Sequence, residues 1–454
     1  MDTLARRAYD HSYRIDPVIR FLSDTDFYKM LMHQFIYKNY FNTSVSFQVF
    51  NRTKSVLLAR DIDIDELRAQ LDHVRTLRWT QQELNYLKAQ EFYGKRDLFS
   101  PAYLDYLEHS FKLSDYTLSV TDDGQILLTF HGTWPETTLW EIYALAIINE
   151  MRYRRVMSKM SKLELDIMYA QAKTKAYRKA KKLAKLANLK ITDFGTRRRH
   201  SHLWQDYIVT LYREVLGKRF IGTSNVYFAM KYGLPAIGTN AHEMPMVYAA
   251  LAAAHKGSDE DIRQAQYEFL KDWQNYYRGG LLIFLPDTFG TTQFLKGAPL
   301  WLADWRGARP DSKKPLPGGE ELIAYWKEHN QPLEEKLIVF ADGLDVRIDG
   351  FEPNGEDITA IYNHFEPTGV GHTYGLGTMG TCDFLGCHPG YLSPELYDPM
   401  RPISLVCKVS EAEGEPAVKL SDNFTKATGT NPETIERYRK IFGHEGMENA
   451  PVMV

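Results

Sequence analysis

The sequence contains few cysteines, no long apolar run and no marked excess of charge of either sign. Its 454 residues include three cysteines, which cannot build a disulfide framework and suit a reducing cytoplasm. The longest apolar stretch, residues 247–254, is far shorter than the roughly 18–20 residues that cross a bilayer. Because 55 Lys and Arg face 58 Asp and Glu, no global basic field favours nucleic acid or a membrane as partner. The first residues also lack the apolar core of a signal peptide, so we expect a cytoplasmic protein.

The composition supports a large folded core. Hydrophobic residues make up 44% of the chain and aromatic residues 13%, and the length suits one large α/β unit plus a smaller domain. Apolar residues at helical spacing predict a helix over 27–35, and alternation predicts a strand over 45–49. A hairpin is predicted over 118–130, where apolar strands flank an Asp-Asp-Gly turn. We therefore expect a mixed α+β domain up to residue 138.

Residues 139–189 are predicted to form a long helix, and the overlapping stretch 152–190 is heavily basic. This stretch holds thirteen Lys and Arg against two acids. One interpretation is a surface for nucleic acid or phosphate, and the other is a solvated helix face with a few functional groups. Because aromatic residues for base stacking are sparse and no nucleic-acid motif accompanies the stretch, we favour the second interpretation.

After residue 190, short apolar runs end repeatedly in Gly-Thr or Asp-Gly. These runs lie at residues 191–196, 220–223, 236–239, 281–291, 337–343 and 376–378. Their β-rich composition and the helix-capable spacers between them predict parallel strands joined by crossovers. The count is about six or seven strands, so we predict an irregular β/α barrel whose site lies at the carboxyl ends of the strands.

Residues 403–409 and 417–420 are predicted to form an antiparallel hairpin, which does not fit a parallel barrel. We expect this hairpin to return to the N-terminal domain, followed by a short helix over 432–442. The predicted class is therefore α/β, with two domains. An N-terminal α+β domain of residues 1–138 is completed by residues 402–454, and a β/α-barrel domain spans residues 139–401.

Gly375, Gly377 and Gly380 have the spacing of a dinucleotide-binding loop. That loop must follow a strand and open a helix, whereas Gly386 and Pro389 break the chain soon after it. We therefore exclude a dinucleotide fold and expect a glycine-rich nest that suits one phosphate.

His242 and Glu243 have the pattern that begins a zinc-protease helix, but Met246 occupies the position of the second histidine. His242 follows a predicted strand end at Thr239 and lies beside a carboxylate. Two interpretations stay open. The residue is either a core histidine with satisfied hydrogen bonds, or a nucleophile or proton carrier.

Charged side chains follow several other predicted strand ends. The arginines at 197–199 come after the strand that ends at Asp193, and guanidinium groups there suit bidentate contacts with phosphate or carboxylate. Arg309 repeats this chemistry farther along the chain. Asp287 and Asp342 each end a strongly apolar strand, where a carboxylate usually binds hydroxyl groups, a metal or a cation.

Taken in chain order, these motifs resemble those of the type II phosphoribosyltransferases, and most closely the bacterial nicotinate phosphoribosyltransferases. The matching segments are 25–29, 193–199, 222–225, 238–243, 287–288, 309–312, 341–345, 375–378 and 419–423. Each segment alone is a weak signal, whereas the ordered set spans nearly the whole chain and is specific.

The resemblance implies that nicotinate and 5-phosphoribosyl 1-pyrophosphate give nicotinate mononucleotide and pyrophosphate, a step of NAD biosynthesis. It also implies coupling to ATP hydrolysis through a phosphohistidine, and His242 matches the phosphorylated position. Asp287 and Asp311 match acids near the ribose hydroxyls and Mg²⁺, so Asp311 is the expected magnesium ligand. The residues that match the surroundings of the ribose phosphate are Arg197, Gly343, Gly377 and Thr378.

The nicotinate site implied by the resemblance combines aromatic rings with an arginine. Tyr28 and Phe194 match the rings that sandwich the pyridine, and related enzymes supply this tyrosine across a homodimer interface. Arg309 matches the arginine that meets the substrate carboxylate. The nicotinamide-using branch carries an acid at the position of Ser224, so the serine favours the acidic substrate, which a second carboxylate would repel.

Two rival functions and one departure from the family pattern accompany this expectation. A barrel glycosidase would use two strand-end acids such as Asp287 and Asp342, although the Gly-Thr loops favour phosphate. A nucleic-acid protein would use residues 152–190. Lys313 and Lys314 depart from the family pattern next to Asp311, and they change the expected surroundings of the magnesium ion.

Overall fold

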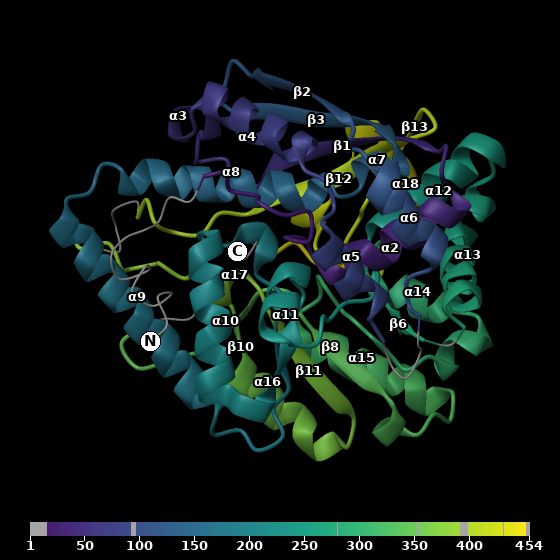
Figure 1. The fold of residues 1–454 in the computed structure, drawn as a ribbon. Helices are drawn as coiled ribbons and strands as arrows, with labels where there is room; N and C mark the ends of the chain where they lie inside the picture. Colours follow the sequence, from purple (N-terminus) through teal and green to yellow (C-terminus); the bar gives the residue numbers. More distant parts are fainter. Residues whose placement is uncertain are drawn as a thin grey trace.

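The computed structural model describes residues 16–91, 97–278, 280–351, 354–390, 398–429 and 431–450. The ends of the predicted N-terminal domain, residues 1–15 and 451–454, lie outside the described residues. Two sheets organise the rest of the chain, one antiparallel and one parallel (Figure 1). The predicted α/β class is therefore confirmed.

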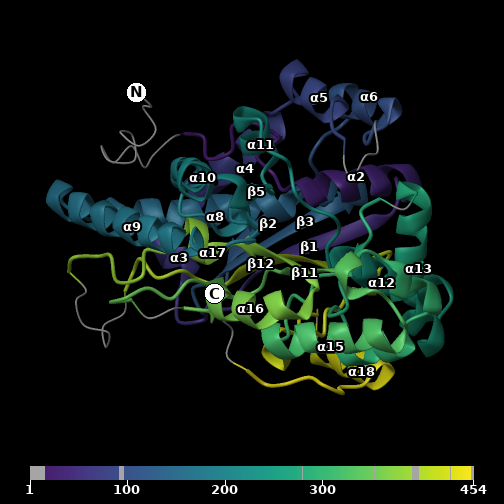
Figure 2. The same ribbon diagram turned by 90° about the horizontal axis from the view of Figure 1, so that it is seen from below.

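The antiparallel sheet joins the two ends of the chain in the order β13-β12-β1-β3-β2. Its strands are β1 (Ser44–Asn51), β2 (Asp115–Val120), β3 (Ile126–Thr133), β12 (Leu405–Ala412) and β13 (Glu415–Pro416). Figures 1 and 2 show the yellow β12 beside the purple β1, although some 350 residues separate them in sequence, and Val49 pairs with Cys407. The predicted return of the C-terminal hairpin is confirmed.

The second strand of that hairpin was misplaced. The prediction of a strand over 417–420 is wrong. The chain turns directly after β12 through Glu413 and Gly414, which both have a positive φ, and the returning strand is Glu415–Pro416. The chain then leaves the sheet, and the backbone N–H of Leu420 donates to the carbonyl of Thr288 at 2.9 Å. This path carries the segment around Lys419 toward the parallel sheet.

The parallel sheet has the order β5-β4-β11-β8-β7-β6. Its strands are β4 (Ile191–Asp193), β5 (Phe220–Thr223), β6 (Ile283–Phe284), β7 (Gly307–Ala308), β8 (Leu337–Phe340) and β11 (Gly371–Leu376). A separate two-stranded sheet pairs β9 (Leu344–Asp345) with β10 (Glu356–Asp357). The predicted run over 236–239 is not a strand, and β7 was not predicted, because two residues carry too little pattern.

The segment after helix α11 (Val226–Tyr232) connects the two edges of the parallel sheet. Ala236 forms a parallel bridge with Thr223 of β5, and Asn240 Nδ2 donates to the carbonyl of Ile283 in β6 at 3.0 Å. The edge strands β5 and β6 do not pair with each other, so the hydrogen-bonded sheet itself stays open. Closure into an irregular barrel therefore stays a prediction that these contacts support.

The helices cover both sheets, and none of the described ones is long and apolar enough to span a membrane. The predicted helices near the two ends are α2 (Phe27–Asn39) and α18 (Pro432–Phe442). The predicted helix over 139–189 is instead two helices, α8 (Trp140–Met157) and α9 (Lys162–Leu183). They are separate because Ser161 and Glu164 form a capping box that starts a new helix.

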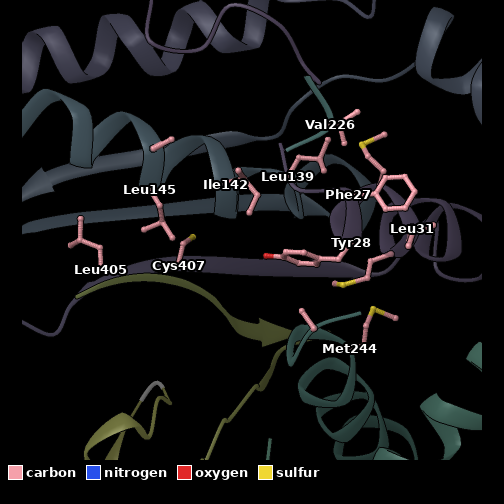
Figure 3. Packing of buried hydrophobic residues seen from close by; sticks show 14 of the residues in the cluster. Phe27, Tyr28, Leu31, Leu139, Ile142, Leu145, Val226, Met244, Leu405 and Cys407 are labelled. Atoms are coloured by element: carbon pink, nitrogen blue, oxygen red, sulfur yellow. The ribbon is translucent and has the colours of Figure 1, made fainter. Parts of the chain in front are cut away.

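The remaining helices are α3 (Leu58–Asp61), α4 (Ile64–Thr76), α5 (Gln81–Lys88), α6 (Pro101–His109), α7 (Trp134–Thr137), α10 (His202–Leu216), α12 (Glu243–His255), α13 (Asp259–Tyr277), α14 (Thr291–Gly297), α15 (Pro315–Glu328), α16 (Ile358–Phe365) and α17 (Thr378–Thr381). Figure 3 shows part of the core, where side chains of α2, α8, α12 and β12 pack together around Tyr28. Helix α8, which we assigned to the barrel domain, packs on β1 and β12 of the antiparallel sheet. The domain boundaries themselves stay predictions.

Candidate active site

One pocket lies where the carboxyl ends of the parallel strands face the antiparallel sheet. The first residues after β4, β5, β7, β8 and β11 all line it, as the repeated strand-end motifs predict. The predicted site residues that line this pocket are Tyr28, Phe194, Arg197, Ser224, His242, Arg309, Asp311, Gly343, Gly377 and Thr378. Asp287 is the predicted residue that does not line it. The strand ends therefore bring together residues from five separate parts of the sequence.

Each of the two aromatic residues in the pocket lies against a glycine. A Cβ atom on Gly375 of β11 would lie 2.2 Å from the ring of Phe194, and one on Gly238 would lie 2.7 Å from the backbone nitrogen of Tyr28. Gly375 therefore leaves room for the Phe194 ring, and Gly238 leaves room for the backbone of Tyr28. Tyr28 and Phe194 line the pocket of the same chain. Helix α2 begins beside this pocket and places Tyr28 in it within one chain, and the expected supply of this tyrosine across a homodimer interface stays a prediction.

His242 directly precedes helix α12 and is buried among polar partners. Its Nδ1 atom lies 2.9 Å from Oγ1 of Thr288, and its Nε2 atom lies 3.0 Å from Oδ2 of Asp311. Burial and the nearby Lys419 lower the pKa of His242 and outweigh the attraction of Asp287 and Asp311, so the imidazole is neutral at pH 7. A neutral imidazole oriented by a carboxylate suits a nucleophile, which favours the second interpretation of this residue.

Asp287 lies behind His242. Its Oδ2 atom accepts a hydrogen bond from Ser312 at 2.7 Å and lies 3.6 Å from Nζ of Lys419. Its Oδ1 atom is buried and has no hydrogen-bond partner among the described residues. Those residues contain no group of three or more His, Cys, Asp or Glu that could hold a metal, but Mg²⁺ commonly takes one or two carboxylates plus substrate phosphates. Asp311 and the unpartnered oxygen of Asp287 fit that pattern.

The arginines at 197–199 point in different directions. Arg197 and Arg198 line the pocket, and Nη1 of Arg197 lies 3.2 Å from Glu141. Arg199 is fully buried, and its two Nη atoms each lie 2.7 Å from an oxygen of Asp24. A bidentate carboxylate contact was predicted for these arginines, but the carboxylate at Arg199 belongs to the protein itself. The side chains diverge because they occupy successive positions at the end of a short 3-10 helix.

Ser224 lies next to an acid of the N-terminal segment. Its Oγ donates to Oδ1 of Asp26 at 2.7 Å, and both residues line the pocket. The backbone holds them together, because the N–H of Phe27 donates to the carbonyl of Ser224 at 2.6 Å. Burial raises the pKa of Asp26, although Arg197 opposes the effect. The pocket therefore contains an acid, Asp26, even with a serine at position 224, and the role of Ser224 in selecting nicotinate stays a prediction.

The chain termini supply cations that sequence reasoning did not place in the site. The additional lysines and arginine of the pocket are Arg52, Lys408, Lys419 and Lys426. Burial lowers the pKa of Lys408 to about 8, although Glu141 opposes the effect. The sequence holds one signal that could have placed Lys408 in the site. This lysine lies inside the apolar run 403–409, where a buried charge needs a partner.

Buried ion pairs below the pocket hold two of its cations. Glu141 lies 3.2 Å from Nη1 of Arg197, 3.2 Å from Nζ of Lys408 and 2.7 Å from Nζ of Lys29. Lys29 also pairs with Glu243, the first residue of α12. Internal carboxylates therefore fix the cations of the pocket before any ligand enters.

Gly343, Gly377 and Thr378 form two loops beside each other on the pocket wall. Gly343 has a φ of 57°, a left-handed conformation that favours glycine. The loop at Gly377 follows a strand, β11, as the apolar run that ends at 376–378 predicts. The helix after it, α17, is only one turn long, so the exclusion of a dinucleotide fold stands.

The sequence matches the models of two related protein domains. Residues 189–446 match the nicotinate phosphoribosyltransferase (NAPRTase) family, and residues 23–149 match the NAPRTase N-terminal domain. The first match covers more than half of the chain, and the two together include every strand of both sheets.

Solved structures show the same fold. A nicotinate phosphoribosyltransferase from Vibrio cholerae is 26% identical, with a TM-score of 0.78 over 96% of each chain. A putative one from Saccharomyces cerevisiae is 27% identical, with a TM-score of 0.76 over 95% of this chain and 99% of that chain. One from Porphyromonas gingivalis is 24% identical, with a TM-score of 0.77 over 94% of this chain and 100% of that chain. The chain belongs to the nicotinate phosphoribosyltransferase family.

Proposed function

We propose that this enzyme transfers the phosphoribosyl group of 5-phosphoribosyl 1-pyrophosphate to nicotinate and couples the transfer to ATP hydrolysis through phosphorylated His242. Family membership supports the transferase activity in NAD biosynthesis. The other parts of the proposal, nicotinate as substrate and the coupling to ATP, rest on one observation. A single pocket joins a buried histidine at a helix N-terminus, two aromatic rings and a group of cations.

The aromatic pair and Arg309 suit the pyridine substrate. Tyr28 and Phe194 supply flat faces for stacking on the ring of nicotinate. Arg309 lines the pocket, and its Nε atom is buried without a hydrogen-bond partner among the described residues. Oδ1 of Asp311 lies 4.0 Å from this atom, too far for a hydrogen bond, so the buried donor suits an anion such as the nicotinate carboxylate.

The cations suit the pyrophosphate and phosphate groups of the second substrate. Displacement at C1 of the ribose develops positive charge on the sugar while pyrophosphate leaves. Arg197 and Lys408 stabilise the leaving anion, and the glycine loops at 343 and 377 hold the 5′-phosphate with backbone N–H groups. Asp311 and Asp287 would hold Mg²⁺, which when bound supplies charge neutralisation for the phosphate oxygens.

The surroundings of His242 suit a phosphohistidine. Asp311 accepts a hydrogen bond from the Nε2–H group, and this tautomer leaves the lone pair on Nδ1 to attack the γ-phosphorus of ATP. The bond between phosphorus and the bridging oxygen breaks, and ADP leaves. The phosphorylated imidazolium keeps its Nε2 proton, which stays hydrogen-bonded to Asp311. The thirteen-residue helix α12 begins at the next residue, and its N-terminal dipole stabilises the negative phosphoryl group.

The geometry is less suited to the rival functions. Asp342 pairs with Lys426, and Asp287 lies outside the pocket, so the two acids do not flank a common space as in a glycosidase. The expected homodimer and the irregular barrel remain parts of the proposal.

The proposal is tested by mixing the purified protein with nicotinate, phosphoribosyl pyrophosphate and Mg²⁺, with and without ATP. We expect nicotinate mononucleotide in both reactions, with a faster rate or a larger yield when ATP is present. A matched reaction with nicotinamide should give far less product. No mononucleotide under either condition contradicts the transferase, and an equal yield without ATP contradicts the coupling.

A further inference from the structure

The basic stretch at 152–190 includes lysines that face the interior of the protein. Lys175 and Lys179 lie one turn apart on helix α9 and are each 3% exposed. They do not belong to a nucleic-acid surface or to a solvated helix face, the two interpretations that the sequence allows. Their charges must be balanced inside the protein.

Lys179 joins two loops that follow different strands. Its Nζ atom pairs with Oδ1 of Asp345, which lies after β8, and lies 2.5 Å from Oδ2 of Asp383, which lies after β11. The same atom is 3.5 Å from the carbonyl oxygen of Met379. Burial lowers the pKa of Lys179, but the two aspartates outweigh burial and raise it, so the ammonium stays charged.

Lys175 reinforces the second of these loops. Its Nζ atom lies 2.6 Å from Oδ1 of Asp383 and 3.1 Å from the carbonyl oxygen of Leu385. Each oxygen of Asp383 therefore has its own lysine. Asp345 in turn accepts hydrogen bonds from the backbone N–H groups of Val346 at 2.7 Å and Asn354 at 2.8 Å.

The two loops joined by these lysines carry one wall of the pocket. Ala341, Asp342, Gly343 and Leu344 line it from the first loop, and Gly377, Thr378 and Met379 line it from the second. A phosphate held by backbone N–H groups from both loops needs them at a fixed separation, because hydrogen bonds weaken steeply with distance and angle. The sheet pairs β8 with β11 as far as Phe340 and Tyr374, and beyond the end of that pairing helix α9 joins the two loops through Asp345 and Asp383.

We propose that Lys179, assisted by Lys175, is a positioning residue that sets the separation of the two phosphate loops from behind the pocket. This inference rests on the proposed function, because it assumes that these loops bind the 5′-phosphate of phosphoribosyl pyrophosphate. Neither lysine lines the pocket, so the effect passes through Asp345 and Asp383.

The test compares Lys179→Met with Lys181→Met, an exposed lysine of the same helix. Calorimetric titration with phosphoribosyl pyrophosphate and Mg²⁺ gives the affinity, and steady-state kinetics give KM for each substrate. We expect Lys179→Met to weaken binding of phosphoribosyl pyrophosphate by about tenfold or more, since small misplacements of binding groups have large effects. KM for nicotinate should change by less than about twofold, because the residues assigned to nicotinate, Tyr28, Phe194 and Arg309, lie outside the two loops. Lys181→Met should match the wild type.

Lys175→Met is the second variant, in case loss of Lys179 prevents folding. It leaves Asp345 paired with Lys179 and removes one of the two partners of Asp383, so a smaller weakening in the same direction is expected. Unchanged affinity in both variants, or an equal rise of KM for both substrates, overturns the inference. Failure of the wild-type protein to bind phosphoribosyl pyrophosphate is a separate result, which overturns the proposed function and this inference with it.

Discussion

Nε2 of His242 lies 3.0 Å from Oδ2 of Asp311, while Nδ1 of the same ring lies 2.9 Å from the hydroxyl of Thr288. A carboxylate beside Nε2 favours the tautomer that carries its proton there. The lone pair is then on Nδ1. This relationship makes Asp311 the group that orients the proposed nucleophile.

Asp311→Asn is expected to slow phosphorylation of His242 by about 100-fold or more, because the amide no longer favours one tautomer or neutralises the imidazolium. The measurement is the rate at which labelled γ-phosphate from ATP becomes protein-bound. An exposed aspartate, Asp349, provides the control as Asp349→Asn. Equal labelling rates in wild type and Asp311→Asn would contradict the assigned role.

The affinity for phosphoribosyl pyrophosphate is expected to fall as the pH rises through about 8. Burial lowers the pKa of Lys408 to about 8, so this pocket cation loses its charge above that pH. At pH 9 the loss should reach about tenfold if only the charged form binds the anion. Lys408→Arg keeps its charge and should flatten the profile. A wild-type profile that is already flat from pH 7 to 9 argues against Lys408 as an anion contact.

Gly375→Ala is expected to raise KM for nicotinate by roughly tenfold, since overpacking of this kind costs about 1–3 kcal/mol. The added methyl would lie 2.2 Å from the Phe194 ring and must displace it. Gly318→Ala is the matched control, because its methyl would lie 3.5 Å from the nearest atoms, at ordinary contact distance. If both variants bind nicotinate like the wild type, Phe194 does not stack on the pyridine.

Asp24→Asn is expected to lower the free energy of unfolding by about 3–5 kcal/mol, because it leaves the buried Arg199 without its charged partner. Burial raises the pKa of Asp24, but Arg199 and His202 outweigh burial and hold it far below its usual value. The stabilisation is therefore complete above the unfolded pKa of about 4 and is lost only as the pH falls through the much lower folded pKa. Denaturant unfolding should give a difference between the two proteins at pH 5 that is at least as large as at pH 8, because protonated His202 also pairs with Asp24. A difference that disappears by pH 5 contradicts the ion pair as its source.

The sequence predicted well those parts of the site that depend on strand ends. Phe194, Ser224 and Gly377 each directly follow a predicted parallel strand, and the carboxyl ends of parallel strands meet at one edge of a sheet. Their gathering in one pocket follows from that rule without any knowledge of how the helices pack. Arg309 follows β7, which was not predicted, so only the family resemblance predicted that it belongs to the site.

Other parts of the site depend on how distant segments pack, which no local pattern encodes. Lys408 lies on β12, near the C-terminal end of the sequence, and this strand pairs with β1, near the N-terminal end. Arg199 and Lys179 belong to basic runs, but the direction of each side chain is set by Asp24 and Asp383, which lie far away in sequence. The sequence shows that such charges exist, and only the fold shows which of them face a ligand.

The central claim is that ATP phosphorylates His242. The direct measurement incubates wild type and His242→Ala with γ-labelled ATP and Mg²⁺, then determines the acid-labile phosphate on each protein and the site by mass spectrometry. Circular dichroism should show the same fold in both. The account predicts acid-labile phosphate on His242 in the wild type and none in the variant, together with loss of the stimulation by ATP. Equal phosphate on His242→Ala, or a labelled peptide that lacks residue 242, would contradict it.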